Sequence, residues 1–183
     1  SVNFGLGDIK YIGSNHVEKL LSSIKEYSSF GLFNEELDWY SFLINVSDKI
    51  SSKVVESLIL AGALTKLEDK KTSRKKCIYE FETWSALTKK EKEWVVKNCQ
   101  QDKDILSAIK KLSPTKKDGG GTFSTKREDI VNDLIIQLEN PPYSLEDYPN
   151  EIAMEEERLL GVALSYSKVD SCDTTSVNTT CKE

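Results

Sequence analysis

Apolar residues recur along most of the chain with the 3.6-residue period of helices that bury one face. The spacing i, i+3, i+4, i+7 occurs in residues 17–24 and again in residues 39–46. Residues 77–84 fit a strand or a helix, and we favour a helix because helical patterns lie on both sides. The pattern therefore predicts an all-α protein of about eight helices, with further apolar stripes in residues 55–59, 94–96, 105–109 and 130–138.

Polar residues and glycines mark where these helices begin and end. Thr88 with Glu91, and Thr125 with Glu128, have the spacing of a capping box, and Gly62 suits the position after a helix. We expect Asn34 to begin the second long helix. The remaining expectations are a solvated turn at 68–76, a helix at 102–112, a mobile Gly/Lys loop at 113–122, a last helix at about 151–164 and an aperiodic tail after 170.

The stretch from residue 4 to residue 21 reads as a helix, a tight turn at Gly13 and a second helix. Asn15 can cap the second helix, and Glu18 stands three residues further on. Backbone N–H groups and the positive end of a helix suit an anion such as phosphate. This is the arrangement of a helix-hairpin-helix DNA-backbone binder. The candidate DNA-binding residues are Lys10, Ile12, Gly13, Ser14, Asn15, His16 and Lys19 here, and Lys49, Ser51, Ser52 and Lys53 at a second unit of the same kind.

The net charge is −5, but it is unevenly distributed. Residues 1–65 carry 5 basic and 8 acidic side chains, residues 66–128 carry 17 and 10, and residues 129–183 carry 3 and 12. The middle third is therefore the only basic region, which fits a protein that meets a polyanion on one side. The lysine-rich stretches 70–76 and 116–117 are either solvated loops or DNA contacts; as contacts they would act through counterion release, without reading bases.

Little else in the chain points to chemistry. The four cysteines lack metal-ligand spacing and there is a single histidine, so we expect reduced thiols, no metal site and no catalytic residues. Asp102 and Asp104 have the spacing of a metal-binding pair, but they sit where a helix begins, a place that favours acids anyway. No apolar run approaches the length of a membrane span, and we expect a cytoplasmic protein.

Three motifs in order resemble one protein family. They are Phe-Gly-Leu-Gly-x-Ile-Lys-x-x-Gly at 4–13, Lys-Ile-x-x-Lys-x-x-Glu-x-Leu-Ile-x-Ala-Gly-Ala at 49–63, and Glu-Glu-Glu-x-Leu-Leu-Gly-x-x-Leu-Ser at 155–165. They resemble the tandem helix-hairpin-helix region of the bacterial replicative DNA polymerase III alpha subunit, a C-family polymerase. Residues 140–147 are similar to phage-type members.

The resemblance implies a region that follows the fingers and grips the duplex behind the active site. The palm, with its catalytic carboxylates and magnesium ions, would lie upstream, so this segment would need no cofactor of its own. Two departures stand out. Tyr11 occupies the place of a family glycine, which is uncomfortable if the turn needs a positive φ. Ser51 and Ser52 stand where the family tends to carry larger polar or basic side chains.

We therefore expect a piece of a longer protein, a DNA-directed DNA polymerase, at the replication fork or nucleoid. Its partners would be double-stranded DNA and the rest of the parent polymerase, with no membrane and no small-molecule substrate. Two alternatives stay open: a protein-interaction scaffold of the replication machinery, and a helix-hairpin-helix part of a repair enzyme. The expected division is 1–67 for the tandem DNA-binding units, 68–122 for a basic helical segment, 123–166 for C-terminal helices and 167–183 for a tail or the start of a next domain.

Overall fold

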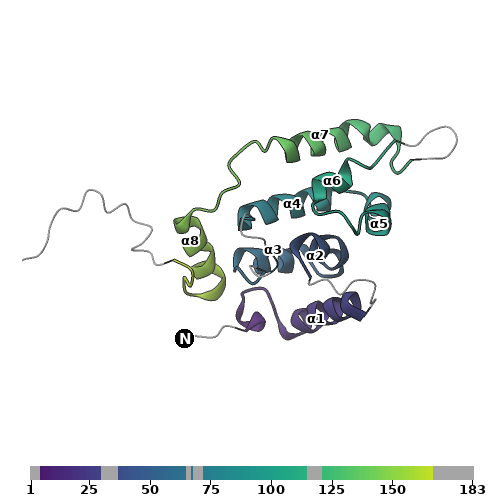
Figure 1. Cartoon of the computed structure of the whole chain (residues 1–183). Helices are drawn as coiled ribbons and strands as arrows, with labels where there is room; N and C mark the ends of the chain where they lie inside the picture. Colours follow the sequence, from purple (N-terminus) through teal and green to yellow (C-terminus); the bar gives the residue numbers. More distant parts are fainter. Residues whose placement is uncertain (1–4, 30–36, 65–66, 68–71, 115–120, 167–183) are drawn as a thin grey trace, which may run out of the picture.

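The chain folds as the predicted all-α protein (Figure 1). The computed structural model describes residues 5–29, 37–64, 67, 72–114 and 121–166. Within these ranges there are eight α-helices and three short 3₁₀ turns, and no strand. The elements are η1 (Leu6–Asp8), α1 (Ser14–Ser29), α2 (Trp39–Asn45), η2 (Ser47–Lys49), α3 (Ser52–Leu60), α4 (Arg74–Ala86), α5 (Lys89–Asn98), α6 (Ile105–Ile109), η3 (Thr125–Arg127), α7 (Glu128–Glu139) and α8 (Pro149–Leu160).

The helices stack in a series, with α1 at the lower edge of Figure 1, α7 at the upper edge and α2 to α6 between them. Most of the buried apolar residues form one cluster that reaches from Ile9 to Leu159. Trp39 and Trp84 are buried in it, and Trp94 packs against it partly buried. The tryptophans therefore belong to the core and do not form a base-stacking surface.

Several helix ends differ from the sequence expectation. Asn34, the expected start of the second long helix, lies outside the described residues; α2 begins at Trp39, where the Asp38 carboxylate accepts from the Ser41 amide at 2.7 Å. Helix α6 is shorter than 102–112, because Asp104 caps it. The last helix is Pro149–Leu160 and stops at Gly161, whose φ is 77°. The middle of the predicted Gly/Lys loop and the tail lie outside the described residues.

One predicted capping box is confirmed and the other is wrong. Thr88 and Glu91 bond each other's backbone amides at the start of α5, at 3.4 and 2.7 Å. Thr125 instead lies in the 3₁₀ turn η3, and no side chain caps this turn or α7. The sequence spacing is the same in both cases, so the difference arises from the tertiary contact that holds Arg127.

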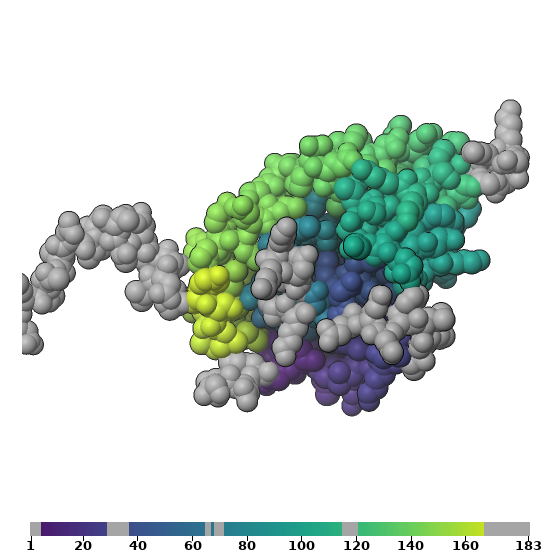
Figure 2. Space-filling model, in the orientation of Figure 1, coloured from purple at the N-terminus to yellow at the C-terminus, as the bar shows by residue number. Residues whose placement is uncertain are grey.

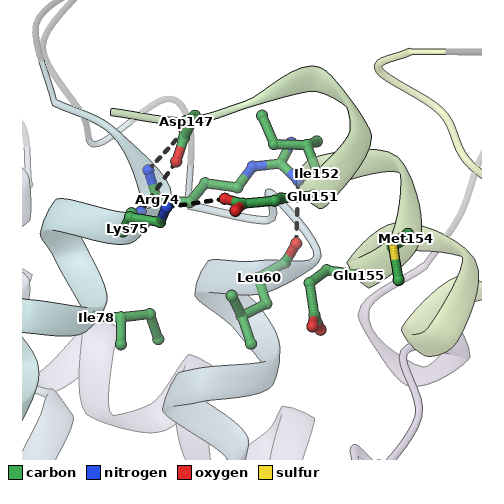
Figure 3. Close-up of a pocket in the computed structure, with 9 residues that line it drawn as sticks. All are labelled: Leu60, Arg74, Lys75, Ile78, Asp147, Glu151, Ile152, Met154 and Glu155. Carbon is green, nitrogen blue, oxygen red and sulfur yellow. Dashed lines mark hydrogen bonds and ion pairs between the residues drawn. The ribbon is translucent and has the colours of Figure 1, made fainter. Parts of the chain in front are cut away.

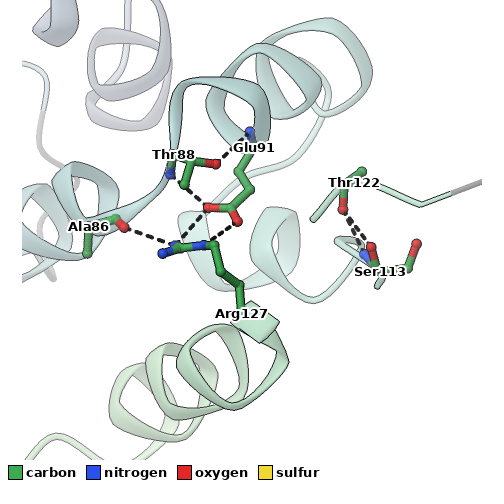
Figure 4. A network of polar contacts seen from close by, with 6 residues as sticks. All are labelled: Ala86, Thr88, Glu91, Ser113, Thr122 and Arg127. Atoms are coloured by element: carbon green, nitrogen blue, oxygen red, sulfur yellow. Dashed lines mark hydrogen bonds and ion pairs between the residues drawn. The ribbon is translucent and has the colours of Figure 1, made fainter. Parts of the chain in front are cut away.

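Arg127 and Glu91 form an ion pair that fastens η3 to α5 (Figure 4). The guanidinium donates to both carboxylate oxygens, at 2.8 and 3.0 Å, and to the Ala86 carbonyl at 3.2 Å. The Glu91 side chain is fully buried, while a quarter of the Arg127 side chain is exposed. Burial raises the pKa of Glu91, but the bonds from Arg127 and Thr88 outweigh it and leave the pKa below its ordinary value.

Residues 74–76 contradict the expected solvated turn, because they form the first turn of α4. Arg74 is buried and its Nη2 lies 2.8 Å from Glu156 Oε1 of α8. Its Nη1 donates to the Leu60 carbonyl at the end of α3, a bond that Figure 3 shows. Glu156 also accepts the amides of Leu164 and Ser165, at 2.6 and 2.7 Å. This ion pair therefore joins α3, α4 and α8.

The segment before α8 is fastened to the same end of α4 (Figure 3). The Asp147 carboxylate accepts the amides of Arg74 and Lys75, at 2.9 and 3.0 Å, and Lys75 Nζ lies 2.8 Å from Glu151. A largely apolar pocket of about 340 Å³ lies beside these contacts. The start of α4 is thus held by a carboxylate distant in sequence.

We predict that Gly62→Ala destabilises the protein far more than Gly161→Ala. Both glycines have left-handed φ, +73° and +77°, which costs a non-glycine residue about 1–2 kcal/mol. A Cβ at Gly62 would lie 2.3 Å from Nη2 of the buried Arg74, whereas one at Gly161 would meet nothing within 4 Å. Urea unfolding should show an additional loss at Gly62 of about 1–3 kcal/mol from overpacking. Equal losses would show that Arg74 moves aside freely.

We also predict that acid weakens the fold through the Glu91 pair. Because the folded-state pKa of Glu91 is lowered, the pair's contribution is complete above the ordinary glutamate pKa of about 4.3 and is lost as the pH falls through the folded value. At neutral pH, Glu91→Gln should cost about 2 kcal/mol, less than a fully buried pair, since Arg127 is partly exposed.

Glu93 provides the matched control for this variant. It lies on the same helix and pairs with Lys89 at 3.8 Å, but both side chains are exposed. Urea unfolding between pH 3 and pH 7 gives the free energy of unfolding as a function of pH. Its fall toward low pH should be smaller for Glu91→Gln than for wild type, whereas Glu93→Gln should behave like wild type. A fall in Glu91→Gln equal to that of wild type would contradict the assignment.

Candidate functional site

The turn between η1 and α1 forces a tyrosine into a backbone conformation that favours glycine. Tyr11 has φ 74°, and it is the one non-glycine residue with positive φ in the described ranges. Ile9 and Ile12 on either side of it are buried, and the Ile12 amide donates to the Ile9 carbonyl at 3.0 Å. The Lys10 amide donates to the Leu159 carbonyl of α8 at 2.8 Å. The core and α8 together therefore impose the turn.

The N-terminus of α1 is closed differently from the predicted capping box. The helix begins at Ser14, and the amides of His16 and Val17 donate to the Gly13 carbonyl. His16 Nδ1 accepts from the Gly13 amide at 3.1 Å, so His16 takes the part that Glu18 was expected to play. Within the described part of the chain, the amides of Ser14 and Asn15 have no hydrogen-bond acceptor. They are available to an anion.

The N-terminus of α3, in the second unit, resembles that of α1. The Ser51 hydroxyl accepts from the Val54 amide at 3.4 Å and caps α3. The amides of Ser52 and Lys53 have no acceptor among the described residues. Lys49 Nζ lies 2.8 Å from Glu26 of α1, so this lysine ties η2 to the first unit.

The ring of Tyr11 connects the two units. Lys10 Nζ lies 5.4 Å from the ring centroid and Lys53 Nζ lies 5.1 Å from it, both within cation–π range. Tyr11 itself is 47% exposed. We call this group of residues, Lys10, Tyr11, Gly13, Ser14, Asn15, His16, Ser52 and Lys53, the lysine–tyrosine corner.

The two helix ends at this corner differ in charge from the others that the structure describes. Neither α1 nor α3 has an acidic residue in its first turn or at its cap. Each of the other six has a carboxylate against its positive end. These are Asp38 at α2, Asp147 at α4, Glu91 at α5, Asp104 at α6, Glu128 and Asp129 at α7, and Glu151 at α8.

Most residues predicted from the sequence to bind DNA are exposed, and most of them lie at or near this corner. Two details of the prediction are wrong: Ile12 is buried at 4% exposure, and the Ile12 and Gly13 amides are already bonded inside the turn. Sequence reasoning missed Tyr11 as a site residue, although its departure from the family glycine was a signal. The exposed members are Lys10, Gly13, Ser14, Asn15, His16, Lys19, Lys49, Ser51, Ser52 and Lys53.

Eight of the twelve basic residues of the middle region that the structure describes pair with carboxylates, and Lys90, Lys97, Lys103 and Lys126 do not. Lys70, Lys71, Lys116 and Lys117 lie outside the described residues. Lys10 and Lys19 of the first unit also have no carboxylate within ion-pairing distance in the described ranges. The middle-region cations that pair with carboxylates are Arg74, Lys75, Lys76, Lys89, Lys92, Lys110, Lys111 and Arg127.

Asp102 and Asp104 do not converge on a common point. Asp104 accepts from the Ser107 amide and caps α6, while Asp102 pairs with Lys111. Across the described ranges, no group of three or more His, Cys, Asp or Glu side chains could hold a metal ion. None of the helices described is both long and apolar enough to cross a bilayer.

Comparisons of the chain with protein-family models, with curated proteins and with solved structures found no match. The resemblance to C-family polymerases therefore rests on the three sequence motifs alone.

Proposed function

We propose that the chain binds duplex DNA by its phosphate backbone, without sequence preference, at the lysine–tyrosine corner. The observation that carries this proposal is a pair of helix N-termini that lack carboxylates, with Lys10 and Lys53 of the two units both within cation–π range of the Tyr11 ring. Free amides at a helix N-terminus bind phosphate oxygens, and lysines add counterion release. Such contacts hold a strand in position and carry no sequence information.

His16 adds a further donor at this site. Because its Nδ1 accepts from the Gly13 amide, the proton of the neutral ring lies on Nε2 and is free to be donated outward. An exposed imidazole at the first turn of α1 can thus bond a phosphate oxygen that the Ser14 and Asn15 amides also approach.

In the wider protein we propose the role that the motif resemblance implies: a module of a replicative DNA polymerase that steadies the primer–template behind the active site. The chemistry would then belong to a palm elsewhere in the parent enzyme, with its magnesium ions. A repair enzyme would use the same grip beside a different catalytic domain. A scaffold would have no affinity for duplex DNA, so binding measurements separate it from the other two.

We predict that a mixed-sequence 20-base-pair duplex binds with an affinity in the non-specific range, with a Kd of about 10⁻⁴–10⁻⁶ M at physiological salt. Contacts with three to five phosphates should give a slope of log K against log salt of about −3 to −4. Fluorescence anisotropy from 50 to 200 mM NaCl measures this slope, and scrambled sequences should bind equally. Absence of binding at 50 mM NaCl would exclude the proposed function.

Gly13→Val should lower duplex affinity about tenfold or more, because the side chain would stand in the path of a phosphate that approaches Ser14. A Cβ at Gly13 meets only His16 Nδ1, at 4.0 Å, so the variant should fold and retain its helical circular dichroism. Gly7→Val is the matched control, since a Cβ there meets nothing within 4 Å. Equal affinity in both variants would remove the α1 N-terminus from the binding surface.

A further inference from the structure

Tyr11 is held in an unfavourable backbone conformation although about half of its surface stays exposed. Its φ of 74° would suit glycine, and the neighbouring Ile9 and Ile12 already anchor the turn in the core. The side chain is 47% exposed, and the charged groups near its ring are Lys10 of the first unit and Lys53 of the second. The ring is therefore not required to hold the turn to the core.

We propose that Tyr11 is a positioning residue: its ring holds the ammonium groups of Lys10 and Lys53 together so that they bind neighbouring phosphates of one DNA strand. This inference rests on the proposed function and assigns the pairing of the two units to one side chain. On this proposal, the tyrosine that stands where the resembled family has glycine is itself part of the binding surface.

Lys10 and Lys53 bring two like charges to one place beside the Tyr11 ring. Two ammonium groups repel each other, and each lysine stem has many rotamers in solvent. The negative face of an aromatic ring attracts both cations, which offsets the repulsion and restricts the stems. The alternative partner of Lys53 is Glu56 at 3.8 Å, an exposed pair of little strength. A duplex then meets two lysines that are already oriented, and less entropy is lost on binding.

Two other roles for the Tyr11 ring predict different binding and stability results. If a base stacked on Tyr11, single-stranded DNA would be preferred and the lysines beside the ring would have to leave. If Tyr11 only stabilised the turn, its loss would lower stability and affinity together. Replacement by glycine separates these cases, because glycine relieves the backbone strain while it removes the ring.

The test compares the full chain with Tyr11→Phe and Tyr11→Gly, using the labelled 20-base-pair duplex at 100 mM NaCl. Tyr11→Phe keeps the ring and should bind within about twofold of wild type. Tyr11→Gly should lose about five- to tenfold in affinity. Its thermal midpoint should be unchanged or higher by about 2–4 °C, since the strain is gone.

A double-mutant cycle then asks whether the lysines act through the ring. The effects of Lys10→Ala and Lys53→Ala on the free energy of duplex binding should be non-additive in the wild-type background. In the Tyr11→Gly background they should be additive. Lys19→Ala is the matched control, because Lys19 is exposed and makes no cation–π contact among the described residues; its effect on the binding free energy should be additive with that of Lys53→Ala in both backgrounds.

The outcomes separate the two proposals. If wild type binds no duplex, the proposed function and this inference fail together. If wild type binds but Tyr11→Gly binds as well or more tightly, only the positioning role is overturned, and Tyr11 is then an obstacle to the phosphate. A loss in Tyr11→Phe equal to that in Tyr11→Gly, a lower thermal midpoint in Tyr11→Gly, or tighter binding of the same-length single strand would also overturn it.

Discussion

The buried pair between Arg74 and Glu156 is the constraint on which the arrangement of the lysine–tyrosine corner depends. It joins the end of α3, the start of α4 and the C-terminal half of α8. Helix α8 in turn receives the Lys10 amide at its Leu159 carbonyl. The purple N-terminal segment and the yellow C-terminal residues are accordingly neighbours in Figure 2. A contact between residues 82 positions apart thus holds the turn that presents Tyr11.

Such a pair stabilises the fold only because its polar atoms are satisfied. Desolvation of a buried carboxylate is costly, and burial raises the pKa of Glu156. Bonds from Ser165, Leu164 and Arg74 outweigh that cost and leave the pKa lowered. Gly62 is part of the same arrangement, because a side chain there would occupy the place of the guanidinium. Position 62 therefore has two independent reasons to be glycine.

The helical fold could be predicted because it follows from local patterns. The apolar period of residues 17–24 and the Thr88–Glu91 box involve contacts within one helix, and both are confirmed. The errors arise where distant residues decide the outcome. Nothing near Arg74 in the sequence indicates that Asp147 and Glu156 will cap and bury it. Likewise Thr125 resembles Thr88 locally, and the contact of Arg127 with Glu91 distinguishes them.

The candidate site was predictable in its residue types but not in its bonds. Glycine, lysines and small polar residues around a helix start indicated anion binding, and most of these residues are exposed in the structure. The sequence did not indicate which amides would be free. In the folded turn the Ile12 amide donates to the Ile9 carbonyl, and the Gly13 amide donates to His16 Nδ1. The meeting of Tyr11 with Lys53 required the packing of two units 42 positions apart, which no local pattern encodes.

The most direct measurement of the central claim is an NMR titration of the ¹⁵N-labelled chain with a short mixed-sequence duplex. The account predicts that the amide resonances of Ser14, Asn15, Ser52 and Lys53 shift first and furthest, and that added salt reverses the shifts. Shifts that concentrate on α4 to α7 while these four amides stay unchanged would contradict it.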